Sequence, residues 1–331
     1  MRILVTGSAG FIGFHLSRAL TGAGHQVIGL DAMTPYYDVR LKEARLKELR
    51  HPNFHQIRGD LNDPAALAEA FAGDGPEIIV HLAAQAGVRY SLEAPLSYAD
   101  ANVSGTIALL EAARAKPPKH ILAASSSSVY GMAGGVMAER QATDQPVSLY
   151  AATKKATEAI THSYAHLFRL PVTCLRFFTV YGPWGRPDMA LFKFVERITA
   201  KAPIEIYGGG EMARDFTFVS DTVASVMALM AAIPGTGPAV PEDTLSPVAP
   251  WRVVNVAGGR PVPLMRFVEA IETAMGQSAH KQFLPMQAGD VVSTAANPAL
   301  LEALTGHVPQ VGVENGVAAF VSWYRSWRAE A

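Results

Sequence analysis

Tyr150 and Lys154 are the two side chains in this sequence best suited to moving a proton. They lie four residues apart in Tyr-Ala-Ala-Thr-Lys, so on a helix they share one face. A free phenol has a pKa of about 10, and a neighbouring ammonium stabilises the phenolate and lowers that pKa. Tyr150 could then accept the proton of an alcohol while a hydride leaves the same carbon. Because this spacing also occurs by chance on exposed helices, the pair needs support from its surroundings.

A run of four serines, Ser125–Ser128, precedes Tyr150 and ends an apolar stretch that predicts a buried strand. A hydroxyl from this run could hydrogen-bond the reacting oxygen and orient it against Tyr150. Not all four serines can do this, and we expect Ser125 and Ser128 to cap the strand end instead.

Three glycines, Gly7, Gly10 and Gly13, follow the first apolar run and open the first helical pattern. At such a junction glycines allow a tight turn, let backbone N–H groups approach a pyrophosphate and let the helix pack on the strand. The helix N-terminus then faces the phosphates. The spacing alone is weak evidence, since any strand–turn–helix junction can hold glycines.

Acidic and small residues follow the next strand patterns. Asp31 ends the second pattern, 18 residues after Gly13. Its carboxylate can accept hydrogen bonds from both hydroxyls of an adenosine ribose and repel a 2′-phosphate, which favours NAD over NADP. Asp60 could contact the adenine, and Ala83 and Ala84 would let a cofactor lie against the backbone. All lie at carboxyl ends of strands, where ligands bind in parallel sheets.

Apolar runs alternate with amphipathic stretches over the first two-thirds of the chain. The runs predict buried parallel strands at Ile3–Val5, Gln26–Leu30, Phe54–Ile57, Ile78–Leu82, Ile121–Ala124 and Val172–Phe177. Helices are expected at Ile12–Ala23, Val39–Arg50, Pro64–Phe71, Leu96–Ala115, Leu149–Phe168, Leu264–Met275 and Val313–Trp327. The alternation predicts an α/β fold, a Rossmann-type doubly wound parallel sheet with a smaller C-terminal α/β substrate-binding domain.

The rhythm changes after about residue 180, at a turn-rich crossing. We expect residues 1–180 to form the NAD-binding domain, including the Tyr–Lys helix. Residues 181–331 would mainly form the substrate-binding domain, partly interleaved with the first. The proline-rich segment Pro234–Pro250 predicts an exposed loop.

The composition argues against several classes of protein. Lys and Arg (28) nearly balance Asp and Glu (29), so nothing favours a nucleic acid or an anionic membrane as partner. The single cysteine, Cys174, cannot form an internal disulfide, and its apolar surroundings indicate a buried strand residue. The histidines show no metal-ligand spacing, so no metal is expected. Without a leader-like start or a long apolar stretch, the expected location is cytoplasmic.

Together these motifs resemble the extended short-chain dehydrogenase/reductases of the NAD-dependent epimerase/dehydratase family, over roughly residues 1–325. The residues that carry the resemblance are Thr6-Gly7-x-x-Gly10-Phe11-Ile12-Gly13, His81-Leu82-Ala83-Ala84, Ser126 with Val129-Tyr130-Gly131, Tyr150-x-x-x-Lys154, and Arg176-Phe177-Phe178-Thr179-Val180-Tyr181-Gly182-Pro183. Within the family, three segments are similar to UDP-glucuronate 4-epimerases: Tyr36-Tyr37-Asp38-x-x-Leu41-Lys42, Gln85-Ala86-Gly87-Val88-Arg89-Tyr90-Ser91 and Gly182-Pro183-Trp184-Gly185-Arg186-Pro187-Asp188-Met189-Ala190.

The resemblance implies a reaction and a set of site residues. A UDP-sugar would be oxidised at C4, turn over in the pocket and be reduced on its opposite face by a tightly bound NAD that is regenerated each cycle. Ser126, Tyr150 and Lys154 would be catalytic. The cofactor-binding residues would be Gly7, Gly10, Phe11, Ile12, Gly13, Asp31, Asp60, Leu61, Leu82, Ala83, Ala84, Tyr150, Lys154 and Phe177. The substrate-binding residues would be Arg89, Ser126, Ser127, Thr179, Arg186, Arg214 and Asp290.

Two features favour UDP-glucuronate, converted to UDP-galacturonate, as the substrate. Family dehydratases and decarboxylases carry acidic residues where this chain has Ser127 and Ser128, which favours an epimerase. Arg186 is the candidate for a bidentate contact to the glucuronate carboxylate. A 4-epimerase of UDP-glucose or UDP-N-acetylglucosamine, a UDP-glucuronate decarboxylase and a non-catalytic NAD-binding scaffold or sensor remain alternatives. By resemblance, the helices at Leu96–Ala115 and Leu149–Phe168 would form the interface of a homodimer.

Overall fold

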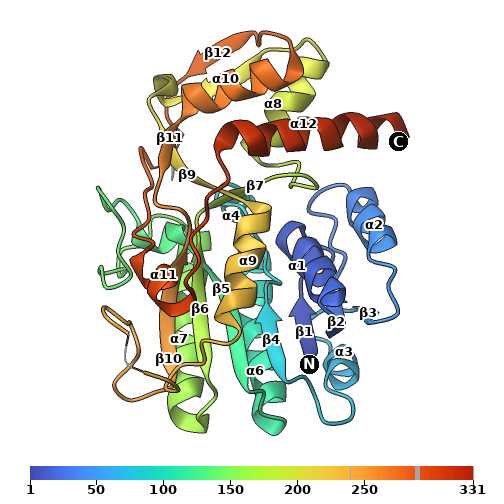
Figure 1. The fold of residues 1–331 in the computed structure, drawn as a ribbon, viewed down its shortest axis with the longest axis vertical. Coiled ribbons are helices and arrows are strands. Elements are labelled where there is room, and N and C mark those ends of the chain that lie inside the picture. Colours follow the sequence, from blue (N-terminus) through green and yellow to red (C-terminus); the bar gives the residue numbers. More distant parts are fainter. Residues whose placement is uncertain (239, 288–290, 331) are drawn as a thin grey trace.

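Seven parallel strands form the central sheet of the computed structural model, which describes residues 1–238, 240–287 and 291–330 (Figure 1). The strand order is β10-β6-β5-β4-β1-β2-β3, and neighbouring strands pair in parallel throughout. Their bounds are β1 (Arg2–Thr6), β2 (Gln26–Asp31), β3 (Phe54–Arg58), β4 (Ile78–His81), β5 (His120–Ser126), β6 (Val172–Phe177) and β10 (Trp251–Val256). The six strands expected from the apolar runs are therefore confirmed, and the order is that of a Rossmann fold. All six were expected to be buried, but the edge strand β3 is only partly buried, with His55 exposed and Ile57 its one buried residue.

The seventh strand, β10, was missed because it carries two polar residues, Arg252 and Asn255, among its apolar ones. Both are buried. The Asn255 amide accepts a hydrogen bond from Tyr130 and donates one to the Met137 carbonyl, so distant parts of the chain satisfy it. A buried polar group paired in this way costs little, which explains how the strand departs from an apolar pattern.

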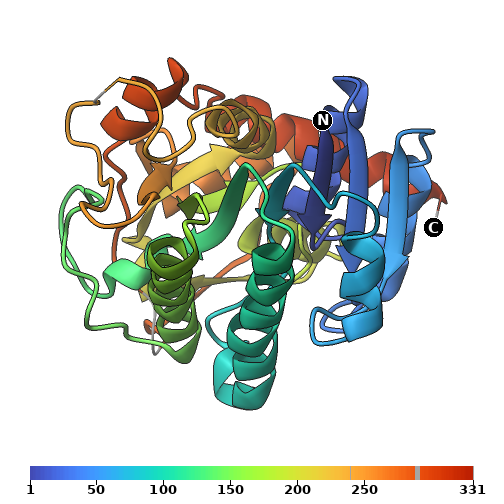
Figure 2. The ribbon, with the colours of Figure 1, turned by 90° about the horizontal axis from the view of Figure 1, so that it is seen from below.

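Helices cover both faces of the sheet (Figures 1 and 2). On one face, apolar side chains of α1 (Phe11–Gly22), α9 (Val219–Leu229) and α11 (Ala299–Thr305) join the sheet in one core cluster. On the other face, α3 (Pro64–Ala70), α6 (Gly105–Ala115) and α7 (Leu149–Phe168) form a second cluster. Figure 2 shows α6 and α7 next to each other on this second face. Cys174 lies fully buried in β6, as expected.

The helix expected at Leu96–Ala115 is interrupted, which corrects the prediction of one continuous element. It consists of α5 (Pro95–Tyr98), a π-helical turn (Ala99–Ser104) and α6, and a short helix α4 (Tyr90–Glu93) precedes it. Asn102 lies within the π turn and hydrogen-bonds Gln85 and Thr153. These contacts come from outside the helix, so the local sequence pattern did not reveal the extra residue in the turn.

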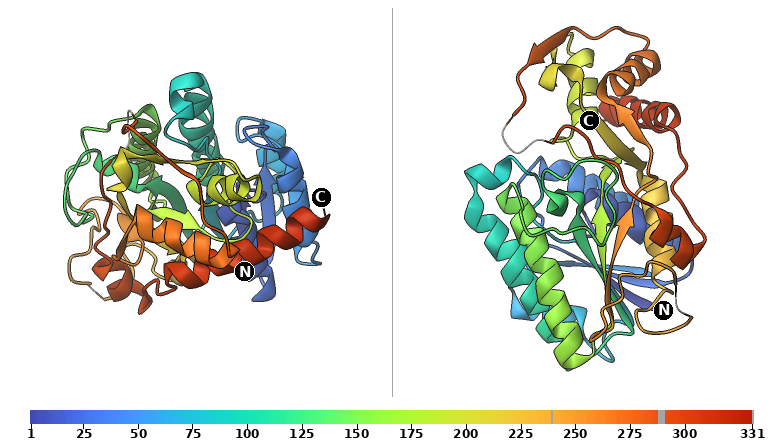
Figure 3. Two further views of the ribbon diagram at one scale, coloured as in Figure 1. Left: turned by 90° about the horizontal axis from the view of Figure 1, so that it is seen from above. Right: turned by 90° about the vertical axis from the view of Figure 1, so that its left-hand side faces the viewer.

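A smaller lobe lies over the carboxyl ends of the parallel strands (Figures 1 and 3). It contains a three-stranded sheet, β11-β9-β7, and a parallel pair, β12-β8. Their bounds are β7 (Thr179–Tyr181), β8 (Ile204–Tyr207), β9 (Ala213–Phe218), β11 (Pro261–Pro263) and β12 (Lys281–Leu284). The helices α8 (Ala190–Thr199), α10 (Leu264–Met275) and α12 (Val313–Glu330) pack with them around an aromatic core. The expected helices near the C-terminus are therefore confirmed.

Two further findings concern the remaining chain. Between Ile233 and Trp251 the described residues form neither helix nor strand, in agreement with the loop expected there. Among the residues that the structure describes, no helix has the length and apolar character needed to cross a bilayer.

Candidate active site

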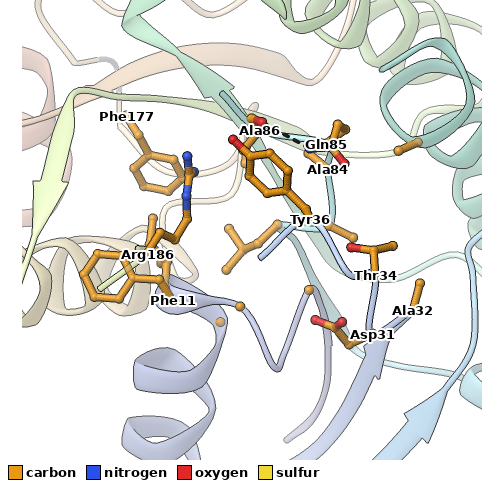
Figure 4. Close-up of a pocket in the computed structure, with 18 of the residues that line it drawn as sticks. Phe11, Asp31, Ala32, Thr34, Tyr36, Ala84, Gln85, Ala86, Phe177 and Arg186 are labelled. Carbon is orange, nitrogen blue, oxygen red and sulfur yellow. Dashed lines mark hydrogen bonds between the residues drawn. The ribbon is translucent and has the colours of Figure 1, made fainter. Parts of the chain in front are cut away.

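A cleft opens at the carboxyl ends of β1, β2, β4, β5 and β6 (Figure 4). All fourteen residues predicted to bind the cofactor line it. They are Gly7, Gly10, Phe11, Ile12, Gly13, Asp31, Asp60, Leu61, Leu82, Ala83, Ala84, Tyr150, Lys154 and Phe177.

The three glycine positions at the junction of β1 and α1 have no room for a side chain. Gly7 adopts a positive φ of 73°, and a Cβ there would lie 2.8 Å from the Ala83 nitrogen of the next strand end. A Cβ on Gly13 would overlap the Gly7 carbonyl. The loop therefore presents bare backbone and the first N–H groups of α1 to the cleft, an arrangement that fits the pyrophosphate of a dinucleotide.

Two of the three catalytic candidates, Tyr150 and Lys154, lie in the first two turns of α7. This helix begins after Ser148, whose hydroxyl accepts a hydrogen bond from the Ala151 N–H at 3.1 Å. One turn further on, Lys154 is buried, and its Nζ donates to the Ala124 carbonyl at 2.9 Å. This bond ties the ammonium to the end of β5, next to the serine run.

The structure reverses the expected net direction of the Tyr150 pKa. Burial raises the pKa of the phenol, while a hydrogen bond with Ser126 and the charge of Arg186 act to lower it. Burial also lowers the pKa of Lys154 to about 8. In the cleft as it stands, Tyr150 therefore keeps its proton at neutral pH and can donate a hydrogen bond to an oxygen beside it.

The serines of the run have different partners from those expected. Ser126, rather than its neighbours, caps the short 3-10 helix that follows β5, since its hydroxyl accepts a hydrogen bond from the Ser128 N–H at 3.2 Å. Ser125 does not cap the strand end: its hydroxyl donates to Glu158 of α7 at 2.7 Å. Glu158 in turn forms a buried ion pair with Arg176 of β6 at 2.8 Å. The pair fixes α7 against the sheet.

Arg186 enters the same cleft from the crossing after β7. Figure 4 shows it beside Phe11 and Phe177, with Asp31 and Thr34 at the opposite end. Its guanidinium donates to both oxygens of Asp188, at 2.9 Å from Nε and 2.6 Å from Nη2. The Arg186 charge acts on the Tyr150 phenol, which places a cation close to the candidate base.

Four of the remaining substrate-binding candidates do not line the cleft: Arg89, Ser127, Thr179 and Arg214. The Arg89 guanidinium lies 4.9 Å from the centre of the Tyr207 ring, and Arg214 donates to the Val292 carbonyl at 3.1 Å. Thr179 lines a smaller apolar cavity that adjoins the cleft, and Ser127 lines neither. Asp290 lies outside the described residues.

Several cleft residues received no role from sequence reasoning. The loop after β2 contributes Thr34, Tyr36 and Tyr37, and helix α2 (Val39–Glu48) contributes Lys42. Gln85, Ala86, Phe178, Val180 and Met189 are further members of this set. Most of the nine residues named here belong to the three segments quoted above for their similarity to UDP-glucuronate 4-epimerases, so a signal was present without a physical role attached to it.

Comparisons with known proteins agree with this geometry. The model of the NAD dependent epimerase/dehydratase family matches residues 3–239. A probable UDP-glucuronate 4-epimerase of Rhizobium meliloti (strain 1021) is 55% identical over 330 residues, which cover 98% of this chain and 97% of the relative. UDP-glucuronate 4-epimerase 1 of Arabidopsis thaliana is 44% identical, over 98% of this chain and 77% of its own.

Solved structures give the same result. The UDP-glucuronic acid 4-epimerase of Bacillus cereus, in complex with UDP-glucuronic acid and NAD, has a TM-score of 0.89 to this chain at 31% identity. The match covers 99% of this chain and 100% of that one. A mutant of the same epimerase with phenylalanine in place of a tyrosine, solved with a 4-fluoro analogue and NAD, also has a TM-score of 0.89.

Proposed function

Because this chain belongs to the NAD-dependent epimerase/dehydratase family, we propose that it interconverts UDP-glucuronate and UDP-galacturonate with NAD as its cofactor. The relatives and structural neighbours named above act on this sugar nucleotide. One observation from the chain itself carries the proposal: the phenol of Tyr150, the hydroxyl of Ser126 and the guanidinium of Arg186 line a single cleft. That cleft offers an acid–base group beside a cation that suits a carboxylate.

The residues of the cleft fit a dinucleotide. Gly7, Gly10 and Gly13 would let the backbone approach the pyrophosphate, and Asp31 would accept hydrogen bonds from the adenosine ribose. A bound NAD would supply the acceptor and donor of the C4 hydride, and its positive charge would favour the phenolate of Tyr150.

Tyr150 is the group that moves the proton. It removes the proton of the C4 hydroxyl during oxidation and gives it back to the C4 oxygen during reduction. Ser126, within hydrogen-bond reach of the phenol, orients the same oxygen. Lys154 is held by the Ala124 carbonyl close to this site, where its charge supports the phenolate. The sugar must turn between the two steps, so that the hydride returns to its opposite face.

Arg186 is the residue that would recognise glucuronate. A sugar oxidised at C4 carries its carboxylate at the β position, so breaking the C5–C6 bond would release CO₂ and leave the electron pair on the enolate of C4 and C5. Hydrogen bonds from a guanidinium fix the plane of a carboxylate, and they can hold the C5–C6 bond away from the orientation that cleavage needs. Arg186 would therefore protect the intermediate as well as bind the substrate.

The test is to incubate the purified protein with UDP-glucuronate, without added NAD, and to separate the products. UDP-galacturonate is the expected product. UDP-pentose would indicate a decarboxylase, and unchanged substrate would contradict the proposal.

A Tyr150→Phe variant should lose about 10²–10⁴-fold in kcat, the usual contribution of a positioned acid–base group. Tyr164→Phe is the matched control, because Tyr164 lies on the same helix and donates to Glu111 at the surface. Tyr164→Phe should turn over like the unchanged protein. Full activity of Tyr150→Phe would exclude the mechanism.

We also propose a cytoplasmic homodimer. Apolar side chains lie exposed on and beside α5, α6 and α7, including Leu96, Ile107 and Leu167, and a partner subunit would cover them. Light scattering should give twice the mass of the chain, and Leu96→Arg should shift the protein toward half that mass. A single buried cysteine fits a reducing compartment.

A further inference from the structure

Three segments of the chain hold the carboxylate of Asp31, and Lys42 supplies one of the three contacts. Oδ2 accepts the Ala9 N–H of the glycine loop at 3.1 Å, and Oδ1 accepts the Met33 N–H at 2.8 Å. Lys42 Nζ donates to Oδ1 at 3.2 Å. Met33 adopts a positive φ of 52°, a conformation that is uncommon for a side chain of this kind. The structure thus accepts a strained residue where it helps to orient this carboxylate.

Lys42 brings a positive charge to the cofactor cleft itself. Its side chain is only 8% exposed, and it lines the cleft together with Asp31 and Thr34. Nζ lies 3.4 Å from the Thr34 hydroxyl and 5.6 Å from the centre of the Tyr37 ring. The carboxylate of Asp31 is the only acidic group that the described part of the chain pairs with this ammonium. A buried ammonium that loses its carboxylate is strongly destabilised, so it would readily accept another anion.

The ion pair changes the electrostatic basis of cofactor choice. A carboxylate at the end of the second strand rejects NADP because it repels the 2′-phosphate. Here an ammonium lies 3.2 Å from that carboxylate, so the two charges nearly cancel as seen from the ribose. A 2′-phosphate is then rejected because Asp31 fills the space that the phosphate would need and already pairs with the Lys42 ammonium. A net negative charge is not the cause.

We propose that Lys42 is a cofactor-specificity residue of this enzyme. In the native site it pairs with Asp31 and holds that carboxylate toward the ribose hydroxyls of NAD. Once Asp31 is removed, the same ammonium, with the Thr34 hydroxyl beside it, binds a 2′-phosphate. The site is therefore one substitution away from accepting NADP, and the residue that makes this possible comes from α2 rather than from the end of β2.

The experiment measures which cofactor is bound, independently of catalysis. Asp31→Ser, Lys42→Met, the double variant and the unchanged protein are each equilibrated with an equimolar mixture of NADH and NADPH. They are then freed of unbound nucleotide and analysed for bound nucleotide by chromatography. Asp31→Ser should raise the ratio of bound NADPH to NADH at least about tenfold, the effect of one charge-assisted hydrogen bond. The double variant should lose most of that rise, and Lys42→Met alone should lower the ratio below that of the unchanged protein.

Two outcomes would overturn the proposal. One is a double variant that binds NADPH as well as Asp31→Ser does. The other is a Lys42→Met protein with lower thermal stability and an unchanged ratio, as expected if Lys42 only fastens α2. Lys47→Met is the matched control, since Lys47 lies exposed on the same helix, and it should leave the ratio unchanged. If Lys42→Met does not fold, Lys42→Gln in the Asp31→Ser background replaces it, and Lys42→Arg in that background should keep the NADPH.

Discussion

Asp188 occupies one edge of the Arg186 guanidinium, the edge formed by Nε and Nη2. Tyr36 completes the arrangement by donating its hydroxyl to the same carboxylate at 3.1 Å. Burial would raise the pKa of Asp188, but Arg186 and Tyr36 hold it below its usual range. Asp188 therefore stays ionised, and a substrate carboxylate is left with the Nη1 side of Arg186. Asp188 thus orients the Arg186 guanidinium before a ligand binds.

Arg186→Ala should weaken the binding of UDP-glucuronate about 10- to 100-fold, because it removes charge-assisted hydrogen bonds to the carboxylate. The binding of UDP-glucose, which has no carboxylate, should change little. Competition binding with the two sugar nucleotides measures the difference. Arg186→Lys should recover only part of the loss, since an ammonium cannot make the bidentate contact. An equal loss for both nucleotides would contradict the role of Arg186 in recognising glucuronate.

Lys154 should make the cofactor-free protein more stable as the pH rises above 8. Burial lowers its pKa to about 8 from the 10.5 of the free side chain. Between these values the unfolded chain binds more protons than the folded one, so the free energy of unfolding increases with pH. Relative to Lys154→Met, the unchanged protein should gain up to about 1.4 kcal/mol per pH unit in this range. Urea unfolding at pH 7.5 and 9.5 tests this, and parallel pH profiles of the two proteins would refute it.

Glu158→Gln should destabilise the fold by about 3–5 kcal/mol, the usual effect of removing one partner of a buried ion pair. The side chains of Glu158 and Arg176 are only 2% and 3% exposed. The exposed pair of Glu43 and Arg58 provides the control, and Glu43→Gln should cost less than about 1 kcal/mol. Chemical denaturation of both variants gives the comparison. Similar losses of unfolding free energy in the two variants would show that burial does not strengthen the Glu158–Arg176 ion pair.

Gly13→Ala and Gly22→Ala place the same methyl group at two points of helix α1. At Gly13 it would overlap the Gly7 carbonyl, so the loop must shift and cofactor binding should be lost or strongly weakened. At Gly22 no atom lies within 4 Å of the new methyl group. Alanine there should stabilise the protein by about 0.4–1 kcal/mol. The bound NAD and the melting temperature of each variant test the contrast, and normal NAD content in Gly13→Ala would contradict it.

The sequence pattern predicted those elements and residues whose structure depends mainly on their neighbours along the chain. The strands β1, β2, β4, β5 and β6 were recognised because a strand buried on both faces is apolar along most of its length. The edge strand β3 has only one buried residue, Ile57, and gives a weaker apolar pattern. The cofactor residues followed from the rule that ligands bind at carboxyl ends of parallel strands. Strand β10 was hidden because its buried Asn255 is satisfied by Tyr130 and Met137, far away in the chain. The π turn at Asn102 was hidden for the same reason, since Gln85 and Thr153 stabilise it from outside.

The partners and pKa values of the charged and titratable side chains were harder to predict than the positions of the strands and of the glycine loop. Arg186 was predicted to bind a carboxylate, and its pairing with Asp188, two residues further on, was not predicted because it depends on how the crossing folds. The direction of the Tyr150 pKa was wrong because spacing along a helix shows a neighbouring ammonium and does not show burial. The partnership of Lys42 with Asp31 joins a helix to a strand end, and neither pattern indicates the other.

The position of β10 in the sheet also limits how this enzyme can be divided into fragments or recombined with relatives. That strand completes the edge of the large sheet beside β6, although β7, α8, β8 and β9 of the smaller lobe come between the two strands along the chain. A fragment that ends at residue 180 would therefore lack β10, and β6 would become an unpaired edge strand that is prone to aggregation. A chimera of two relatives, made to change the sugar specificity, therefore cannot be built with a single crossover point. It must keep residues 251–256, with α9 and α11, from the parent that supplies the cofactor half.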